Sequence, residues 1–160
     1  MVKKMSLAWQ NCSEEELKLK LAEWLGRTDL KDSILFLEGE MGAGKSTFVR
    51  EILRILSPAA KSQGSPTFPL IQTYQINEKL PFYHIDLYRL KNESELADSG
   101  IEAQIEEEPA IVCVEWASLF SEAFSHWFAP MLPHKKKRVY LIRIVANGPD
   151  RRDYRIVEYP

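Results

Sequence analysis

Apolar residues recur every three or four positions in several stretches of the chain, a spacing typical of helices that bury one face. The first stretch follows Ser13 and Glu16, which form a capping box that satisfies the free amides at a helix start. Gly26 is the expected end of this helix. Its buried face is predicted to consist of Leu17, Leu21, Trp24 and Leu25.

Three further segments have helical patterns. Residues 48–56 carry apolar side chains at helical spacing and end before Pro58. Residues 93–105 predict two short helices divided by Gly100, and residues 117–128 predict a last helix.

Short, continuous apolar runs lie between these helical segments. Residues 34–37 and 111–114 are such runs, and each is typical of a strand that is buried on both faces. Strands that alternate with helices in this way favour an α/β fold with a mostly parallel central sheet.

Two further strand pairs are predicted by polar turns between apolar segments. One pair is residues 70–76 and 82–87, with the turn at Asn77 and Glu78. The other pair, residues 137–145 and 154–159, is predicted to close the sheet with antiparallel strands.

Composition narrows the class of protein. The chain has 160 residues, about the length of one domain, so we predict a single domain over residues 1–160. The formal net charge of −2 argues against nucleic-acid binding by bulk electrostatics, and no apolar run is long enough to cross a membrane. Cys12 and Cys113 are far apart and form no metal-binding pair, which favours free thiols and a cytoplasmic location.

The strongest chemical signal is a phosphate-binding loop between the buried strand 34–37 and the following helix. The pattern GxxxxGK[ST] is matched by Gly39, Glu40, Met41, Gly42, Ala43, Gly44, Lys45 and Ser46, and Thr47 follows. Glycines let successive backbone N–H groups converge on one anion, and the helix start adds positive charge. We expect the Lys45 ammonium to reach the phosphates and the Ser46 hydroxyl to bind Mg²⁺.

Such a loop needs an acidic residue at the end of a neighbouring strand, to hold the metal or to position water. Asp86 and Glu115 each end a predicted strand, and this pattern leaves open which of them serves the metal. The guanine-recognition pattern NKxD is missing, so we expect ATP rather than GTP.

Several segments in this order resemble the TsaE (YjeE) family, the bacterial P-loop ATPases required for threonylcarbamoyladenosine (t6A) modification of tRNA. The segments that carry the resemblance are the P-loop, Ser65-Pro66-Thr67-Phe68, His84-Ile85-Asp86-Leu87-Tyr88-Arg89-Leu90, Glu95-Leu96, Gly100-Ile101 and Val114-Glu115-Trp116. The resemblance implies one P-loop α/β domain with ATP and Mg²⁺ as cofactors. It also implies slow ATP hydrolysis that rises on contact with the TsaB–TsaD pair. We expect tRNA to be contacted only indirectly or weakly.

The resemblance also implies roles for single residues. Ser46 and Glu115 correspond to the magnesium ligands, and Asp86 to an acid close to the metal or the attacking water. Lys45 corresponds to the phosphate-binding lysine, and Thr67 lies in a switch-like segment near the γ-phosphate. Lys45, Thr67 and Asp86 are therefore the predicted catalytic residues.

The resemblance extends to the part of the nucleotide outside the phosphates. Ser13 and an arginine near the end of the chain, Arg151 or Arg152, fall where the family contacts it. Pro69 departs from the threonine common in the family and removes a backbone donor next to the switch segment.

Other residues have two interpretations. By the two-residue period of a strand, His84 faces the same way as Asp86, either as an orienting group for it or as an ordinary hydrogen-bonded sheet residue. Trp116 is either a core residue or a contact for nucleotide or partner. The basic run 135–138 is either solvated or a docking patch for tRNA or an acidic partner.

Two other classes of function compete with a partner-dependent ATPase. A small-metabolite kinase usually carries an arginine-bearing lid, but only Arg50, Arg54 and Arg89 lie between the P-loop and Glu115. A pure binding module would not need both strand-end acids beside an intact P-loop.

Overall fold

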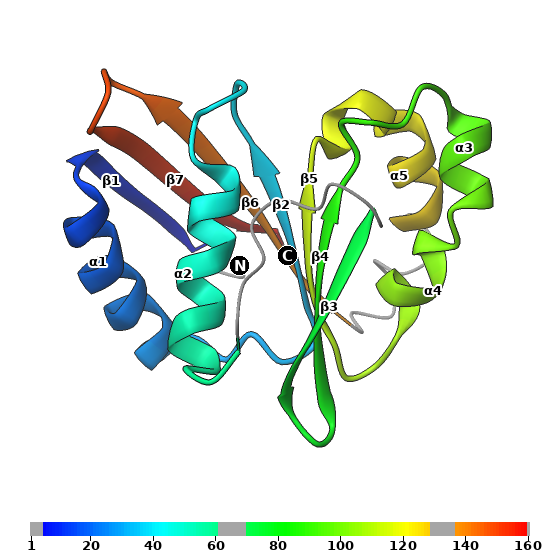
Figure 1. The fold of residues 1–160 in the computed structure, drawn as a ribbon, viewed down its shortest axis with the longest axis horizontal. Coiled ribbons are helices and arrows are strands. Elements are labelled where there is room, and N and C mark those ends of the chain that lie inside the picture. The colour runs from blue at the N-terminus through cyan, green and yellow to red at the C-terminus, as the bar shows by residue number, and fades with distance from the viewer. Residues whose placement is uncertain (1–4, 61–69, 129–136, 160) are drawn as a thin grey trace.

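The computed structural model describes residues 5–60, 70–128 and 137–159 (Figure 1). In this part of the chain, one sheet of seven strands has the order β1-β7-β6-β2-β5-β4-β3. The strands are β1 (Ser6–Cys12), β2 (Ser33–Glu38), β3 (Ile71–Asn77), β4 (Leu80–Asp86), β5 (Ile111–Glu115), β6 (Arg138–Ala146) and β7 (Arg152–Tyr159).

The centre of the sheet is parallel and its edges are antiparallel. β6, β2, β5 and β4 run in one direction, whereas β3 pairs antiparallel with β4, and β7 pairs antiparallel with β6 and β1. The predicted α/β fold with parallel centre and antiparallel closing strands is confirmed, and the sheet as a whole is mixed.

The helices begin close to where the pattern predicts. They are α1 (Glu14–Arg27), α2 (Lys45–Leu56), α3 (Glu93–Asp98), α4 (Ile101–Glu106), the 3₁₀ helix η1 (Ala117–Phe120) and α5 (Ser121–Phe128). The capping box is present, because Ser13 Oγ accepts from the Glu16 N–H and the Glu16 carboxylate accepts from the Ser13 N–H. The predicted division at Gly100 is also confirmed, with φ of +74° at this glycine.

Three sequence expectations about boundaries are wrong. The first helix does not end at Gly26, because the chain stays helical to Arg27 and becomes extended at Thr28. The β3–β4 turn is one residue later than predicted, since β3 includes Asn77. The last predicted helix is divided into η1 and α5.

Strand β1 is absent from the sequence prediction. It is an edge strand that pairs only with β7, and most of its residues are exposed or half-buried, so its hydrophobic pattern is weak. Asn11 interrupts it with φ of +51°, where the register with β7 also shifts. A strand of this kind owes its existence to its partner rather than to its own pattern.

Two core layers lie on opposite faces of the sheet (Figure 1). α1 and α2 cover one face, and their apolar side chains pack on alternate residues of β2, β6 and β7, among them Leu35 and Tyr140. α3, α4, η1 and α5 cover the other face and pack on residues such as Ile34 and Val114. This alternation explains why the central strands are apolar at nearly every position.

The parallel centre also determines where polar side chains collect. β2, β4 and β5 end with their carboxyl ends at the same edge of the sheet, and the P-loop begins directly after Glu38. Asp86 and Glu115 are partners in the register of β4 and β5. The strand order therefore brings both acids beside the P-loop.

The first glycine of the P-loop is required by a close approach of two backbones. A Cβ added at Gly39 would lie 2.6 Å from the Ile144 carbonyl oxygen of β6 and 3.0 Å from the Ala43 Cβ. Neither neighbour is the flexible end of a long side chain, so a methyl group there would push the loop away from β6.

We expect Gly39→Ala to lower the free energy of unfolding by about 1–3 kcal/mol, the usual range for overpacking, when measured by urea denaturation. Gly26→Ala is the matched control, because nothing lies within 4 Å of a Cβ there and the residue is helical. It should raise stability by up to about 1 kcal/mol. Equal effects of the two substitutions would contradict the steric argument.

Candidate nucleotide and metal site

The loop between β2 and α2 has the backbone shape of an anion-binding nest. Gly42 and Gly44 have φ of +77° and +105°, and the Ala43 N–H donates to the Glu40 carbonyl over 3.0 Å. α2 begins at Lys45, so the positive end of the helix faces the inside of the loop. The predicted P-loop therefore has the local geometry that its sequence implies.

Lys45 is held inside the loop. Its Nζ donates to the Gly39 carbonyl over 2.7 Å and to the Glu40 carbonyl over 2.9 Å. Burial lowers the pKa of this ammonium, while the nearby carboxylates of Glu115 and Asp86 act in the opposite direction. A phosphate entering the loop would gain a lysine that is already desolvated and positioned.

An aromatic pair covers the lysine. Lys45 Nζ lies 4.1 Å from the centroid of the Trp116 ring, and the Trp116 and Tyr88 rings are 4.9 Å apart. Trp116 has φ of +64°, which is uncommon for a bulky residue and indicates a backbone held by its surroundings. Trp116 therefore belongs to the wall of the site.

The Glu115 carboxylate is buried and receives hydrogen bonds from two other elements. Its Oε1 accepts from Ser46 Oγ on α2 over 2.7 Å and lies 2.7 Å from Nε2 of His84 on β4. The Glu115 side chain is 3% exposed. His84 therefore contacts Glu115, not Asp86, and of the two interpretations of this histidine the structure supports a hydrogen-bonded sheet residue that serves the other acid.

Asp86 lies at the mouth of the same cleft. Its Oδ1 accepts from the Tyr88 N–H over 3.1 Å. Burial raises the pKa of this carboxyl, and the Glu115 carboxylate raises it further, against the opposing effects of the Tyr88 N–H, His84 and Lys45. An acid in this state has a strengthened affinity for a proton.

These side chains share one cleft of about 340 Å³. Its lining comprises Met41, Gly42, Gly44, Lys45, Ser46, Thr47, Asp86, Tyr88, Glu115 and Trp116. Among the described residues, no three His, Cys, Asp or Glu side chains are grouped to hold a metal ion by themselves. A hydroxyl and one carboxylate fit Mg²⁺, which commonly takes few protein ligands and completes its shell with phosphates and water.

A second cleft of about 230 Å³ lies on the other side of the loop. It is lined by Ser13, Glu14, Glu15, Gly44, Thr47, Pro149, Asp150, Arg152 and Tyr154. Ser13 and Arg152, the residues predicted to contact the nucleotide outside its phosphates, therefore face a space that shares Gly44 and Thr47 with the first cleft.

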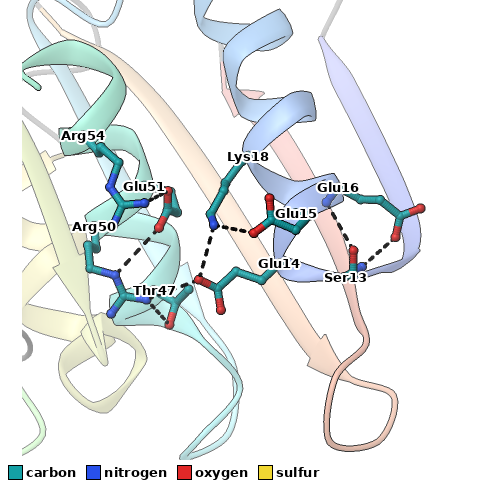
Figure 2. A network of polar contacts seen from close by, with 9 residues as sticks. All are labelled: Ser13, Glu14, Glu15, Glu16, Lys18, Thr47, Arg50, Glu51 and Arg54. Carbon is teal, nitrogen blue, oxygen red and sulfur yellow. Dashed lines mark hydrogen bonds and ion pairs between the residues drawn. The ribbon is translucent and has the colours of Figure 1, made fainter.

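A polar network joins α1 and α2 beside this second cleft (Figure 2). Arg50 Nη2 donates to Thr47 Oγ1 over 3.3 Å and lies 3.9 Å from the Glu14 carboxylate. Arg50 and Arg54 also flank the buried Glu51 carboxylate, at 3.8 and 3.3 Å. Arg50 thus links α2 to α1 through Glu14, and Arg54 pairs with Glu51 on its own helix.

The two arginines near the end of the chain differ in role. Arg152 donates through Nε to the Ala43 carbonyl over 2.9 Å and through Nη1 to Gly148 and Pro149 carbonyls, so it fastens the P-loop to the β6–β7 turn. Arg151 instead pairs with Glu16 over 2.7 Å. The pairing of β1 with β7 brings Arg151 beside Asn11 and Glu16, and the sequence pattern does not reveal this pairing.

Some predicted residues lie outside the described part of the chain. They are Thr67 with the rest of the segment 65–68, Pro69, and the first two residues of the basic run, Lys135 and Lys136. The rest of the run is partnered, because Lys137 Nζ donates to the Glu107 carbonyl and Arg138 lies 4.0 Å from the Asp29 carboxylate. No helix in the described residues has the length and apolar character needed to cross a membrane.

A parallel-centred sheet with a glycine-rich loop between its central strand and the next helix, and two acids at neighbouring strand ends, defines a P-loop α/β protein. Within this class, the family model described as "Threonylcarbamoyl adenosine biosynthesis protein TsaE" matches residues 12–147. The chain belongs to the TsaE family.

Curated relatives agree with this assignment. The chain is similar to "tRNA threonylcarbamoyladenosine biosynthesis protein TsaE" of Rickettsia conorii, 39% identical over 120 residues that make up 75% of this chain and 64% of the relative. The protein of the same name from Bacillus subtilis is 32% identical over 147 residues, 92% of this chain and 82% of the relative.

The matched region spans 64% and 66% of the Rickettsia conorii and Rickettsia felis proteins, about two thirds of their length. The crystal structure of Bacillus subtilis YdiB has a TM-score of 0.62, covers 98% of this chain and 88% of its own, and is 24% identical. That likeness is one of fold.

The raised pKa of Asp86 predicts a pH-dependent effect of Asp86→Asn on stability. The favourable contribution of the protonated carboxyl, present below about pH 4, is lost as pH rises through the folded pKa. An amide keeps an acceptor for the Tyr88 N–H and has no charge to desolvate. We therefore expect the thermal midpoint of D86N to rise relative to the parent protein between pH 4 and pH 7.5.

Asp153→Asn is the control of opposite sign. Hydrogen bonds from Asn147 and from the Asn11 N–H hold the pKa of Asp153 below its usual value. Its stabilising contribution is present at neutral pH and lost as pH falls, so D153N should lose stability relative to the parent as pH rises. A D86N curve that follows the D153N curve would show that burial does not dominate at Asp86.

Proposed function

We propose that this protein is a Mg²⁺-dependent ATPase that serves t6A modification of tRNA by acting on the TsaB–TsaD complex. The observation that carries the proposal is the convergence of Lys45, Ser46 and Glu115 in one cleft at the mouth of the P-loop. Membership of the TsaE family supplies the biological setting.

The backbone of residues 39–44 and the Lys45 ammonium would bind the β- and γ-phosphates. Lys45 donates two of its three hydrogens to loop carbonyls, and a phosphate oxygen is a stronger, charged acceptor that would replace them. The second cleft, which shares Gly44 and Thr47 with the first, would take the nucleoside. We propose that the base is adenine, so that the nucleotide is ATP.

Ser46 and Glu115 would hold the magnesium ion. A hydroxyl has one hydrogen and two lone pairs, so Ser46 can donate to Glu115, as it does over 2.7 Å, and offer a lone pair to the metal at once. Bound there, Mg²⁺ would neutralise phosphate charge and polarise the group that is transferred.

Asp86 would orient the attacking water and take its proton. Its carboxyl lines the phosphate cleft, and burial raises its pKa towards the range in which a general base works. Thr67 is included in the proposal on the sequence resemblance alone, as a switch residue near the γ-phosphate.

An accessory ATPase is favoured over a metabolite kinase. A kinase needs cations that close over the phosphates, but Arg50 and Arg54 point to acidic groups between α1 and α2 (Figure 2). We therefore propose that the cleft serves hydrolysis and that its energy resets the TsaB–TsaD pair, with tRNA contacted only indirectly. Buried, unpaired Cys12 and Cys113 support a reducing, cytoplasmic location.

The decisive experiment measures ATP turnover of the purified protein with and without TsaB–TsaD from the same organism. We expect slow hydrolysis alone, an increase on addition of the pair, and ADP and phosphate as the products. Lys45→Ala is the control, and its affinity for ATP should fall at least about tenfold because charge-assisted contacts contribute roughly 1.5–3 kcal/mol. A phosphorylated metabolite would support a kinase, and turnover without any dependence on the pair would contradict the partner assignment.

Glu115→Gln should separate binding from hydrolysis. The amide keeps the shape of the side chain but loses the charge that holds Mg²⁺, so we expect nucleotide affinity within a few-fold of normal and hydrolysis reduced about a hundredfold or more. Calorimetric titration and a phosphate-release assay measure the two quantities. Normal turnover in this variant would assign the metal to Asp86 instead.

A further inference from the structure

Among the residues that the structure describes, His84 is the one buried polar side chain at the site that the proposed chemistry does not use. It lies in the middle of β4, is 3% exposed, and places its Nε2 2.7 Å from Glu115 Oε1. The sequence places it near Asp86, two residues along the same strand, but the contact crosses to β5. Such a placement calls for a role that involves Glu115.

We propose that His84 is a positioning residue that fixes the Glu115 carboxylate for magnesium binding, by donating its Nε2–H to Oε1. The inference rests on the proposed function, because it assumes that Glu115 is the metal ligand. It adds a residue whose action is exerted through another side chain, without contact with metal or nucleotide.

The hydrogen bonds of Glu115 support a positioning role for His84. Among the described residues, the side chains within hydrogen-bond distance of its carboxylate are Ser46 and His84, and both reach Oε1. No described donor reaches Oε2, so one oxygen is held in place and the other is available to a cation. A carboxylate held by one oxygen cannot rotate freely about its last bond, which lowers the entropy that metal binding must remove.

The two donors differ in how firmly they are held. The Ser46 hydroxyl rotates about a single bond and changes its surroundings when a cation binds its oxygen. The His84 ring projects from a strand whose backbone is paired with Gln72 on one side and Cys113 on the other. His84 is therefore the donor that keeps Glu115 in place before and after the metal arrives.

The burial of the Glu115 carboxylate also requires a donor such as His84. An ionised carboxylate that is 3% exposed needs hydrogen bonds to replace lost water. The nearest ammonium, Lys45, donates to the carbonyls of Gly39 and Glu40 rather than to Glu115. Without His84 the carboxylate would keep only the serine hydroxyl, and its orientation would no longer be determined.

The test compares His84→Phe, which removes the donor at similar volume, with His84→Gln, whose amide can still donate to Oε1. The probe is Mn²⁺ titrated into each protein at saturating ADP, with free Mn²⁺ followed by electron paramagnetic resonance. We expect the dissociation constant for Mn²⁺ to rise at least about tenfold in H84F and to stay within about threefold in H84Q. The affinity for ADP without metal should stay within about twofold in both.

Phe82→Leu is the matched control. Phe82 is buried on β4 two residues before His84, on the same face of the strand, and its loss of packing should lower the thermal midpoint without changing Mn²⁺ affinity. Unchanged Mn²⁺ affinity in H84F would overturn the inference, as would equal losses in H84F and H84Q. A parent protein that binds neither ADP nor Mn²⁺ would instead overturn the proposed function.

A measurement on the parent protein decides the matter if H84F does not fold. The proposal requires a hydrogen on Nε2 at neutral pH, which a ¹⁵N spectrum of the histidine rings reports directly, with the His84 signal assigned by its loss in H84Q. A His84 ring that carries its hydrogen on Nδ1 alone would overturn the proposal.

Discussion

The parallel pairing of β2, β5 and β4 is the constraint on which the site depends. Parallel strands end together, so the loop after Glu38 and the side chains of Asp86 and Glu115 must meet at one edge. Two carboxylates in register on neighbouring strands repel each other, which contributes to the raised pKa of Asp86. The apolar contacts that bury these strands on both faces hold this unfavourable arrangement in place.

The site is therefore a place where stability is given up locally. Lys45 is desolvated, Asp86 is raised in pKa, Trp116 adopts an uncommon backbone angle, and Gly39 can carry no side chain. Each of these features is unfavourable or restrictive in the free protein. Together they present a nest, an ammonium and a hydroxyl–carboxylate pair that need little rearrangement to receive a charged ligand.

Hydrogen bonds between elements far apart in the chain connect the site to the rest of the fold. Arg152 on β7 fastens the P-loop, and His84 on β4 holds Glu115 on β5. The two clefts on either side of Gly44 thus have walls fixed by different contacts. A substitution in one wall can leave the other cleft intact, so the proposed roles of these residues can be separated experimentally.

Local pattern in the sequence was sufficient for the motif and for the helices and strands other than β1. These features depend on neighbours within a few residues, which is why the sequence predicts them: the capping box at Ser13, the buried runs of β2 and β5, the glycine at position 100 and the loop 39–46. The convergence of Asp86 and Glu115 with the loop could also be predicted, because both acids follow apolar strands. The helix end predicted at Gly26 is one residue early, because the chain stays helical to Arg27 and becomes extended at Thr28.

Tertiary structure alone decided which groups touch. Strand order made His84 a partner of Glu115 instead of Asp86, and it brought the Ile144 carbonyl against Gly39. The pairing of β1 with β7 created a strand with almost no pattern of its own and directed Arg151 to Glu16. The physical reason is common to all of these: periodicity specifies the face on which a side chain lies, but the identity of its neighbour depends on packing between segments that are distant in the chain.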